Sequence, residues 1–354
     1  MLSFRLVPNS RVCANISPGT QHRGEDVDQG DATIVVVPRD HFSDTRESLE
    51  SLYAGMPPSN PLVYVDGGSP PRIARYLREE ARARNFELIR YEHYLTPNQA
   101  RNAGAERVKT RYIVFVDNDI IVAPGWLPPL VECAKTTGAA VVGPLNFERR
   151  PLLQTVHFAG GDARISITNE NGKEHRRLVD RIQKVRIPPG HEPTDAAEFH
   201  CMLVRTDVFR RLGGLDENML STRENIDFCL ALQKAGEKVY LEPRSRITYL
   251  PPDPLRLTDV PFFALRWSDL WDLSSFHYLR DKWNLDEDEY FRRQYENVGW
   301  RRRELMMRGS VLRWLVSVRL RRIAERVLRP VERRLNATIA RRHARRHGVW
   351  LRLQ

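Results

Sequence analysis

Short apolar runs alternate with amphipathic segments along the first third of the chain. The runs are rich in β-branched and aromatic residues and predict buried strands at 32–37, 62–65, 86–91 and 112–116. The segments between them repeat apolar residues at helical spacing and predict helices, one after Ser43 and others at 70–85 and 98–108. Strands that alternate with helices at this spacing favour a three-layer α/β fold with a central, mostly parallel sheet.

The pattern continues with less regularity beyond residue 121. Residues 200–206 and 238–241 predict strands, 207–212 predict a helix ended by two glycines, and 224–234 predict an amphipathic helix. We therefore assign residues 31–250 to one α/β domain, with halves at 31–120 and 121–250.

Charge is concentrated at the end of the chain. The net charge is +11, but residues 301–354 hold seventeen arginines, no lysine and three glutamates, which leaves −3 for the rest. Within this basic helical tail, 311–328 sets an apolar stripe against arginines, which favours contact with an anionic membrane surface. The alternative, given equal weight, is a helix docked on its own domain or on another subunit. Nucleic acid is not expected as a partner, because no reader fold accompanies the arginines.

Composition limits the location of the protein. The chain has 354 residues, 41% of them hydrophobic, without an apolar run long enough to span a membrane or an apolar signal segment near its start. We expect a cytosolic protein with a disordered leader at 1–30, and the tail is the candidate for peripheral contact with the inner membrane face. The four cysteines are scattered without C-x-x-C spacing, which indicates reduced, structural thiols.

Carboxylates directly follow two of the predicted strands. Asp117 and Asp119 flank Asn118 after one strand, and Asp66 with two glycines follows another. Because the carboxyl ends of parallel strands share an edge, we expect both loops to face one cleft. Two carboxylates one residue apart can both reach a divalent cation, whereas the alternative is an ordinary polar turn. Neither a dinucleotide fingerprint nor a P-loop occurs, so a metal-held phosphate site is the first hypothesis.

In their order and spacing, seven motifs resemble those of the family 2 glycosyltransferases, which have the GT-A nucleotide-sugar-binding fold. The resemblance covers residues 33 to about 249, and each motif is weak by itself. The matching pieces are the first strand with Pro38, then 65–69 (VDGGS), 98–104 (NQARNAG), 115–119 (FVDND), 201–205 (CMLVR), 213–217 (GGLDE) and 224–228 (ENIDF) followed by Ala235-Gly236.

The resemblance implies roles in the donor half, 31–120. Asp119 would bind Mn²⁺ or Mg²⁺ across the diphosphate, and Asp117 would contact the ribose or the water shell of the metal. A hard cation suits this chemistry because it neutralises charge on the leaving nucleoside diphosphate. The remaining donor contacts would be Pro38 and Asp66 at the nucleotide base, and Arg101 and Asn102 along the nucleotide-sugar.

The acceptor half, 121–250, departs from the family at the catalytic base. An inverting transferase needs a carboxylate that takes the proton of the attacking hydroxyl. In much of the family this is the second residue of a Glu-Asp pair, where this chain has Asn225. Glu224 is then the preferred base and Asp227 the second candidate, unless Asp227 only stabilises the start of the helix. The E-N-x-[DE] arrangement also occurs in retaining GT-A enzymes that glycosylate polypeptides, so inversion is favoured but open.

A second departure concerns the metal shell. Many relatives place a histidine where this chain has Tyr249, and a neutral phenol is a poor ligand. His277 or water would then complete the shell, although an unpaired surface position is the preferred interpretation of His277. Asp195 and Glu198 are candidates for contact with acceptor hydroxyls, a role that surface carboxylates seldom have.

Aromatic residues cluster in an expected helical extension at 251–300. They either form a small core that docks the tail on the sheet or pave a sugar-binding surface, because sugar C–H faces stack on rings. We favour the core, with Trp267 or Trp271 at the edge of an acceptor groove. The cluster consists of Phe262, Phe263, Trp267, Trp271, Phe276, Tyr278 and Trp283.

The sequence therefore predicts a metal-dependent glycosyltransferase. It would move a sugar from a nucleotide-sugar to a glycan, lipid-linked or small-molecule acceptor, with inversion. One alternative is a sugar nucleotidyltransferase, for which a glycine-rich basic loop is expected where this chain has 38–41, PRDH. The other is a nucleotide-sugar-binding scaffold without catalysis, which Asn225 and Tyr249 together suggest.

Overall fold

The computed structural model describes residues 30–308 and 318–352. The predicted leader, 1–30, lies outside the described residues except for Gly30. Of the amphipathic segment 311–328, residues 311–317 also lie outside, and for 318–328 only the backbone is described.

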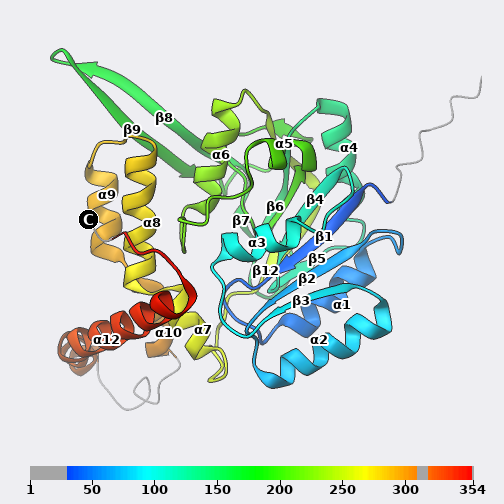
Figure 1. The fold of residues 1–354 in the computed structure, drawn as a ribbon. Coiled ribbons are helices and arrows are strands. Elements are labelled where there is room, and N and C mark those ends of the chain that lie inside the picture. The colour runs from blue at the N-terminus through cyan, green and yellow to red at the C-terminus, as the bar shows by residue number, and fades with distance from the viewer. Residues whose placement is uncertain (1–29, 309–317, 353–354) are drawn as a thin grey trace, which may run out of the picture.

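The first part of the chain alternates strands and helices, as the hydrophobic pattern predicts (Figure 1). Each predicted strand and helix here is present, with ends that differ by at most a few residues. The elements are β1 (Ala32–Val37), α1 (Thr45–Gly55), β2 (Leu62–Gly67), α2 (Pro71–Arg84), β3 (Glu87–Tyr91), α3 (Pro97–Ala105) and β4 (Tyr112–Asp117).

The middle of the chain adds strands that the sequence analysis did not anticipate. The unanticipated elements are β5 (Ile120–Val122), α4 (Leu127–Thr137), β6 (Val141–Glu148), β7 (Thr155–Phe158), a hairpin of β8 (Gly161–Glu170) and β9 (Lys173–Ile182), and β10 (Glu192–Pro193). The anticipated ones are β11 (Cys201–Arg205), α5 (Thr206–Arg211), α6 (Glu224–Lys234) and β12, which is longer than predicted (Val239–Tyr249).

The central sheet has the strand order β10-β12-β6-β11-β4-β1-β2-β3. Strands β1 to β4 are parallel to one another, and β12 is parallel to β6. Strand β11 lies between these two groups and is antiparallel to both β4 and β6. At the margins, β10 and β5 pair antiparallel with β12, and β7 pairs antiparallel with β6. The carboxyl ends of β1, β4 and β6 therefore share an edge with the start of β11. The predicted α/β class with a mostly parallel sheet is confirmed.

The sheet is buried on both faces, since successive strand side chains point to opposite sides. In β1 and β4, Ile34 and Val114 pack beneath α1, α2 and α4, whereas Val35 and Phe115 pack beneath α3, α5 and α6. Helix α3 lies so close to the sheet that a Cβ atom at Gly104 would overlap the Val35 side chain. This packing fixes the strand ends that carry the acids.

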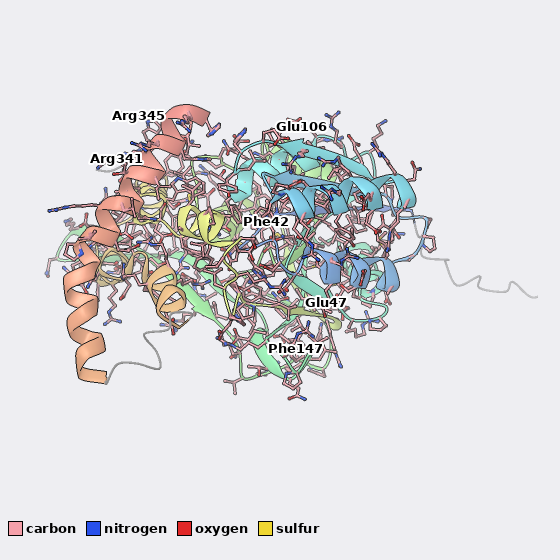
Figure 2. All side chains as sticks on the ribbon, turned by 90° about the horizontal axis from the view of Figure 1, so that it is seen from below. Phe42, Glu47, Glu106, Phe147, Arg341 and Arg345 are labelled. Carbon is pink, nitrogen blue, oxygen red and sulfur yellow. The ribbon has the colours of Figure 1, made fainter. Side chains whose placement is uncertain are left out.

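The C-terminal helices form a separate layer at one end of the sheet (Figures 1 and 2). They are α7 (Val260–Arg266), α8 (Asp269–Lys282), α9 (Glu289–Asn297), α10 (Trp300–Arg308) and α12 (Val318–His347). Most of the aromatic cluster is buried between them, and Phe262 packs against Phe42 of the loop after β1, at 4.8 Å between ring centres. This agrees with the core interpretation. Among the described helices, none combines the length and apolarity needed to cross a bilayer.

Candidate active site

The loops at the ends of β1 and β4 are tied together by Asn118. Its side-chain amide donates to the carbonyl of His41 at 2.8 Å, and its side-chain oxygen accepts from the backbone N–H of Arg39 at 2.9 Å. Asn118 therefore has a structural role between the two acids and presents Arg39 and His41 to them.

Asp117 is fully buried and has two close partners. Its carboxylate accepts from Arg101 at 3.0 Å and lies 3.1 Å from Nδ1 of His200. Burial alone would raise the pKa of Asp117, but Arg101 and the His200 hydrogen bond outweigh it, so the pKa is lowered. Burial also lowers the pKa of His200, which favours a neutral ring that donates from Nδ1 and keeps a lone pair on Nε2.

Asp119 is equally buried but lacks such partners. Among the described residues, neither of its carboxylate oxygens has a hydrogen bond, and its nearest cationic group is His41 Nδ1 at 3.6 Å. Burial raises the pKa of Asp119 well above its usual value. Ligand atoms of Asp117, Asp119 and His200 lie within 4.8 Å of one another. His200 was not predicted as a site residue, because only the antiparallel pairing of β11 with β4 returns it to the edge where β4 ends.

Glu224 starts α6 and faces three arginines. Its Oε1 lies 2.5 Å from Arg39, 3.6 Å from Arg101 and 3.7 Å from Arg266. Burial opposes ionisation, yet Arg39, Arg266 and Arg101 together lower the pKa of Glu224 to about 2. The glutamate is therefore a firmly held anion in this state.

The same arginines have unused donors. All three side-chain nitrogens of Arg266, together with Nε of Arg39 and of Arg101, are buried without a hydrogen-bond acceptor in the described part of the chain. Buried guanidinium groups with open donors suit an anionic ligand such as a phosphate. Arg39 and Arg266 were not found from the sequence, because only the fold brings α7 to the end of β1.

A cavity of about 260 Å³ opens beside this charged cluster. Its lining includes Arg39, His200, Glu224 and Asn225, and the C-terminal part of the chain adds Phe263, Trp267, Trp300 and Arg301. Glu198 also lines the cavity, 3.4 Å from His157, whereas Asp195 pairs with Arg164 of the hairpin.

The other residues expected along the donor are, like Asp117 and Asp119, not part of the cavity lining. Asp66 accepts from Ser69 and from Arg90, and buried Pro38 lies against Gly67 at the same strand end. The side-chain amide of Asn102 donates to the carbonyl of Leu215 and accepts from the backbone N–H of the same residue, so Asn102 supports a loop. Of the four, Arg101 alone joins the charged cluster.

Asp227, the second base candidate, points away from Glu224. Its carboxylate accepts from Lys282 and from the Trp283 indole, both at 2.8 Å. These contacts tie α6 to α8.

Tyr249 and His277 are both engaged elsewhere. The Tyr249 hydroxyl donates to Asp40 at 2.7 Å, its ring stacks on His200 at 4.4 Å between centres, and the Trp267 indole donates to the same Asp40. His277 stacks on Tyr295 at 4.8 Å. Neither belongs to the group formed by Asp117, Asp119 and His200.

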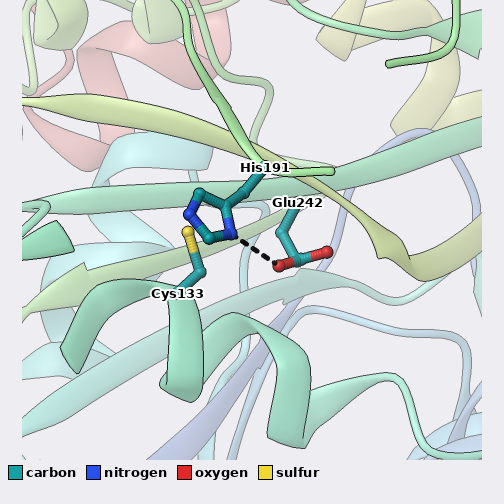
Figure 3. A group of neighbouring side chains, drawn as sticks. All are labelled: Cys133, His191 and Glu242. Atoms are coloured by element: carbon teal, nitrogen blue, oxygen red, sulfur yellow. Dashed lines mark ion pairs between the residues drawn. The ribbon is translucent and has the colours of Figure 1, made fainter. Parts of the chain in front are cut away.

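A further group of potential ligands, Cys133, His191 and Glu242, lies away from the cavity (Figure 3). Within this group, His191 Nδ1 lies 3.7 Å from the Glu242 carboxylate. Arg244 already neutralises Glu242, at 2.8 Å, and burial raises the pKa of the Cys133 thiol to about 12. We therefore assign this group to the packing of α4 on β12.

Comparison with known proteins identifies the family of the chain. Residues 33–212, just over half of the chain, match the family described as Glycosyl transferase family 2. The Pre-mycofactocin glycosyltransferase of Mycobacterium tuberculosis is 25% identical over 221 residues, which are 62% of this chain and 42% of that protein. The O-antigen biosynthesis protein RfbC of Myxococcus xanthus is 24% identical over 65% of this chain and 18% of its own length.

Two further matches complete the comparison. The "Uncharacterized protein y4gI" of Sinorhizobium fredii is 23% identical over 81% of this chain and 31% of that protein. The chain thus spans less than half the length of each of these relatives. A solved structure, GalNAc-T7 with UDP, GalNAc and Mn²⁺, has a TM-score of 0.48 and 17% identity over 77% of this chain and 57% of that one. The family match confirms the resemblance seen in the motifs, and the chain belongs to glycosyl transferase family 2.

Proposed function

We propose that the chain is a metal-dependent glycosyltransferase that moves a sugar from a nucleotide-sugar to a glycan, a lipid-linked precursor or a small molecule. The observation that carries the proposal is the buried carboxylate of Asp119, which accepts no hydrogen bond among the described residues and lies beside Asp117 and His200. Burying a carboxylate without hydrogen bonds is costly, and a divalent cation is the partner that converging oxygen ligands suit. These three residues would hold Mn²⁺ or Mg²⁺, which when bound neutralises charge on the leaving nucleoside diphosphate.

The arginines would hold the diphosphate from the other side. Arg266 has three open donors, and Arg39 and Arg101 have one each. These open donors would pair with phosphate oxygens, and the cation would offset the charge of the neighbouring acids.

Glu224 is the base in this proposal, and its role depends on the donor. With a pKa of about 2 it is too weak a base while three arginines surround it. A diphosphate that draws Arg39 and Arg266 toward itself would raise this pKa. Glu224 would then take the proton of the acceptor hydroxyl as that oxygen attacks the anomeric carbon opposite the leaving group, which gives inversion.

The decisive experiment measures release of nucleoside diphosphate from UDP-, GDP-, dTDP- and CDP-sugars, with Mn²⁺ or Mg²⁺ and a broad acceptor mixture. We expect turnover of donors that carry one particular nucleobase. The turnover rate should fall at least about a hundredfold in Asp119→Ala, because the cation loses a ligand. Activity of Asp119→Ala at the wild-type level would remove the metal assignment. Glu224→Gln should bind donor but transfer almost nothing, and full activity there would remove Glu224 from the role of base.

The scaffold alternative is favoured by one observation, the suppressed basicity of Glu224 next to an asparagine. It expects donor binding without turnover for every donor tested. We also propose that the protein is cytosolic and peripheral on the inner membrane face, held there by its basic tail.

A further inference from the structure

Helix α12 has three different faces along the part whose side chains are described, 329–347. Residues along an α-helix advance by about 100° each, so positions three and four apart share a face. One face is buried: Ala340 and Ala344 pack with Leu265 and Trp271, and Asn336 donates to the carbonyl of Ala264 at 2.8 Å. This face docks the helix on α7 and α8.

An apolar stripe lies on the opposite side and is exposed. Val331, Leu335 and Ile339 follow one another at intervals of four residues and are 62%, 62% and 43% exposed. Exposed aliphatic side chains are ordinary when single, but three in a row on one helix face form a contact surface.

Exposed arginines flank and extend the stripe. Arg334, Arg341 and Arg345 line one side of it, and Figure 2 shows the last two on the outer part of α12. Arg342 and Arg346 continue the stripe itself. Within the described residues, none of these five has a carboxylate at ion-pair distance, in contrast to Arg333 and Arg302, which pair with Asp269.

We propose that this outer face of α12, made of Val331, Leu335 and Ile339 with the five arginines, binds the surface of an anionic lipid bilayer. An amphipathic helix with aliphatic residues on one face and arginines beside them lies in the headgroup region, with its apolar side chains among the acyl chains. A second copy of the same face is a poor partner because the unpaired arginines would repel one another. Nucleic acid would satisfy the arginines but leave the aliphatic stripe in water.

The location of this face bears on the acceptor, an extension that rests on the proposed function. Helix α7 connects the two sites, because Phe263 lines the cavity and the neighbouring Ala264 binds α12. The lipid-binding face is thus one helix away from the wall of the cavity. A membrane-borne, lipid-linked acceptor is therefore the class of acceptor that this arrangement favours.

Vesicle sedimentation of the full chain tests the proposal. We expect binding to phosphatidylcholine vesicles that contain about one third phosphatidylglycerol, weak binding to phosphatidylcholine alone, and release by high salt. The triple variant Val331→Ser, Leu335→Ser, Ile339→Ser should lower the partition coefficient at least about tenfold. Arg334→Gln, Arg341→Gln, Arg345→Gln should lower it similarly, with most of the loss at low salt.

A matched control removes three exposed aliphatic residues elsewhere. Ile167→Ser, Val185→Ser, Ile187→Ser changes side chains that are 56%, 94% and 48% exposed and should bind vesicles like the wild type. Equal loss in the control, or unchanged binding in the α12 variant, would overturn the proposal. So would a fall in molar mass of the α12 variant by light scattering, which would make the face a self-association surface.

Failure of the transferase proposal would look different. Vesicle binding by a chain that turns over no nucleotide-sugar would leave the lipid surface standing and remove only the inference about the acceptor. Turnover without vesicle binding would leave the transferase proposal standing and remove both the lipid-binding face and the inference about the acceptor.

Discussion

Glu224 combines complete burial with a lowered pKa, so its contribution to stability depends on pH. A carboxyl group whose folded pKa lies below its ordinary value of 4.5 stabilises the protein above that pH, and this contribution is lost as the pH falls through about 2. We expect Glu224→Gln to lower the free energy of unfolding by about 3 kcal/mol at pH 7, because three arginines lose their counter-charge. The difference from the wild type should shrink between pH 4.5 and 2 in urea titrations, and a constant difference would contradict the electrostatic explanation.

The contacts of Asp227 argue against the role of catalytic base that the sequence suggested for it. It binds Lys282 and Trp283 of the neighbouring helix. Asp227→Asn should therefore keep turnover within about threefold while lowering the free energy of unfolding by ~1–3 kcal/mol. A loss of more than a hundredfold in turnover, with an unchanged circular dichroism spectrum, would restore Asp227 as a base candidate.

At the scale of elements, a helix or strand could be predicted where neighbouring residues determine it, but not where it depends on pairing with distant strands. Strand β1 and helix α6 were predicted with their observed ends, because apolar runs and helical spacing are written into consecutive residues. The antiparallel direction of β11 arises from pairing with β4 and β6, and the hairpin of β8 and β9 is too polar to resemble a buried strand. For the same reason consecutive residues single out Asp117, Asp119 and Glu224 as candidates, whereas Arg266 and His200 come beside them only through the fold.

The close contact of α3 with β1 gives a prediction at this scale. Gly104→Ala should destabilise the fold by ~1–3 kcal/mol, since the new Cβ would overlap Val35 and force the helix away from the sheet. Gly143→Ala is the control: a Cβ there would meet its nearest neighbour, Ala197, at 3.6 Å, an ordinary contact. Chemical denaturation of both variants provides the measurement, and equal midpoints would argue against tight packing at α3.

At the scale of the whole molecule, the C-terminal layer is held by a buried arginine. Arg302 donates to Glu332 at 2.6 Å, to Asp269 at 2.8 Å and to the carbonyl of Trp267. Arg302→Met should lower the free energy of unfolding by about 3 kcal/mol and speed hydrogen exchange in α12 first, because two carboxylates lose a shared cation. Arg293→Met, which breaks a surface pair with Glu289, should change stability by less than ~0.5 kcal/mol. Uniform acceleration of hydrogen exchange throughout the chain would contradict a local role of Arg302 in holding the C-terminal helices.

The wall that the C-terminal helices contribute to the cavity has an evolutionary consequence. The segment shared with the family ends at residue 212, while Phe263, Trp267, Trp300 and Arg301 come from beyond it. This part of the cavity can therefore diverge without altering the strand ends that carry Asp117 and Asp119. A lineage, or a protein engineer, could vary these four residues to change the shape of the cavity, provided that Arg266 of α7, which lies 3.7 Å from Glu224, is retained.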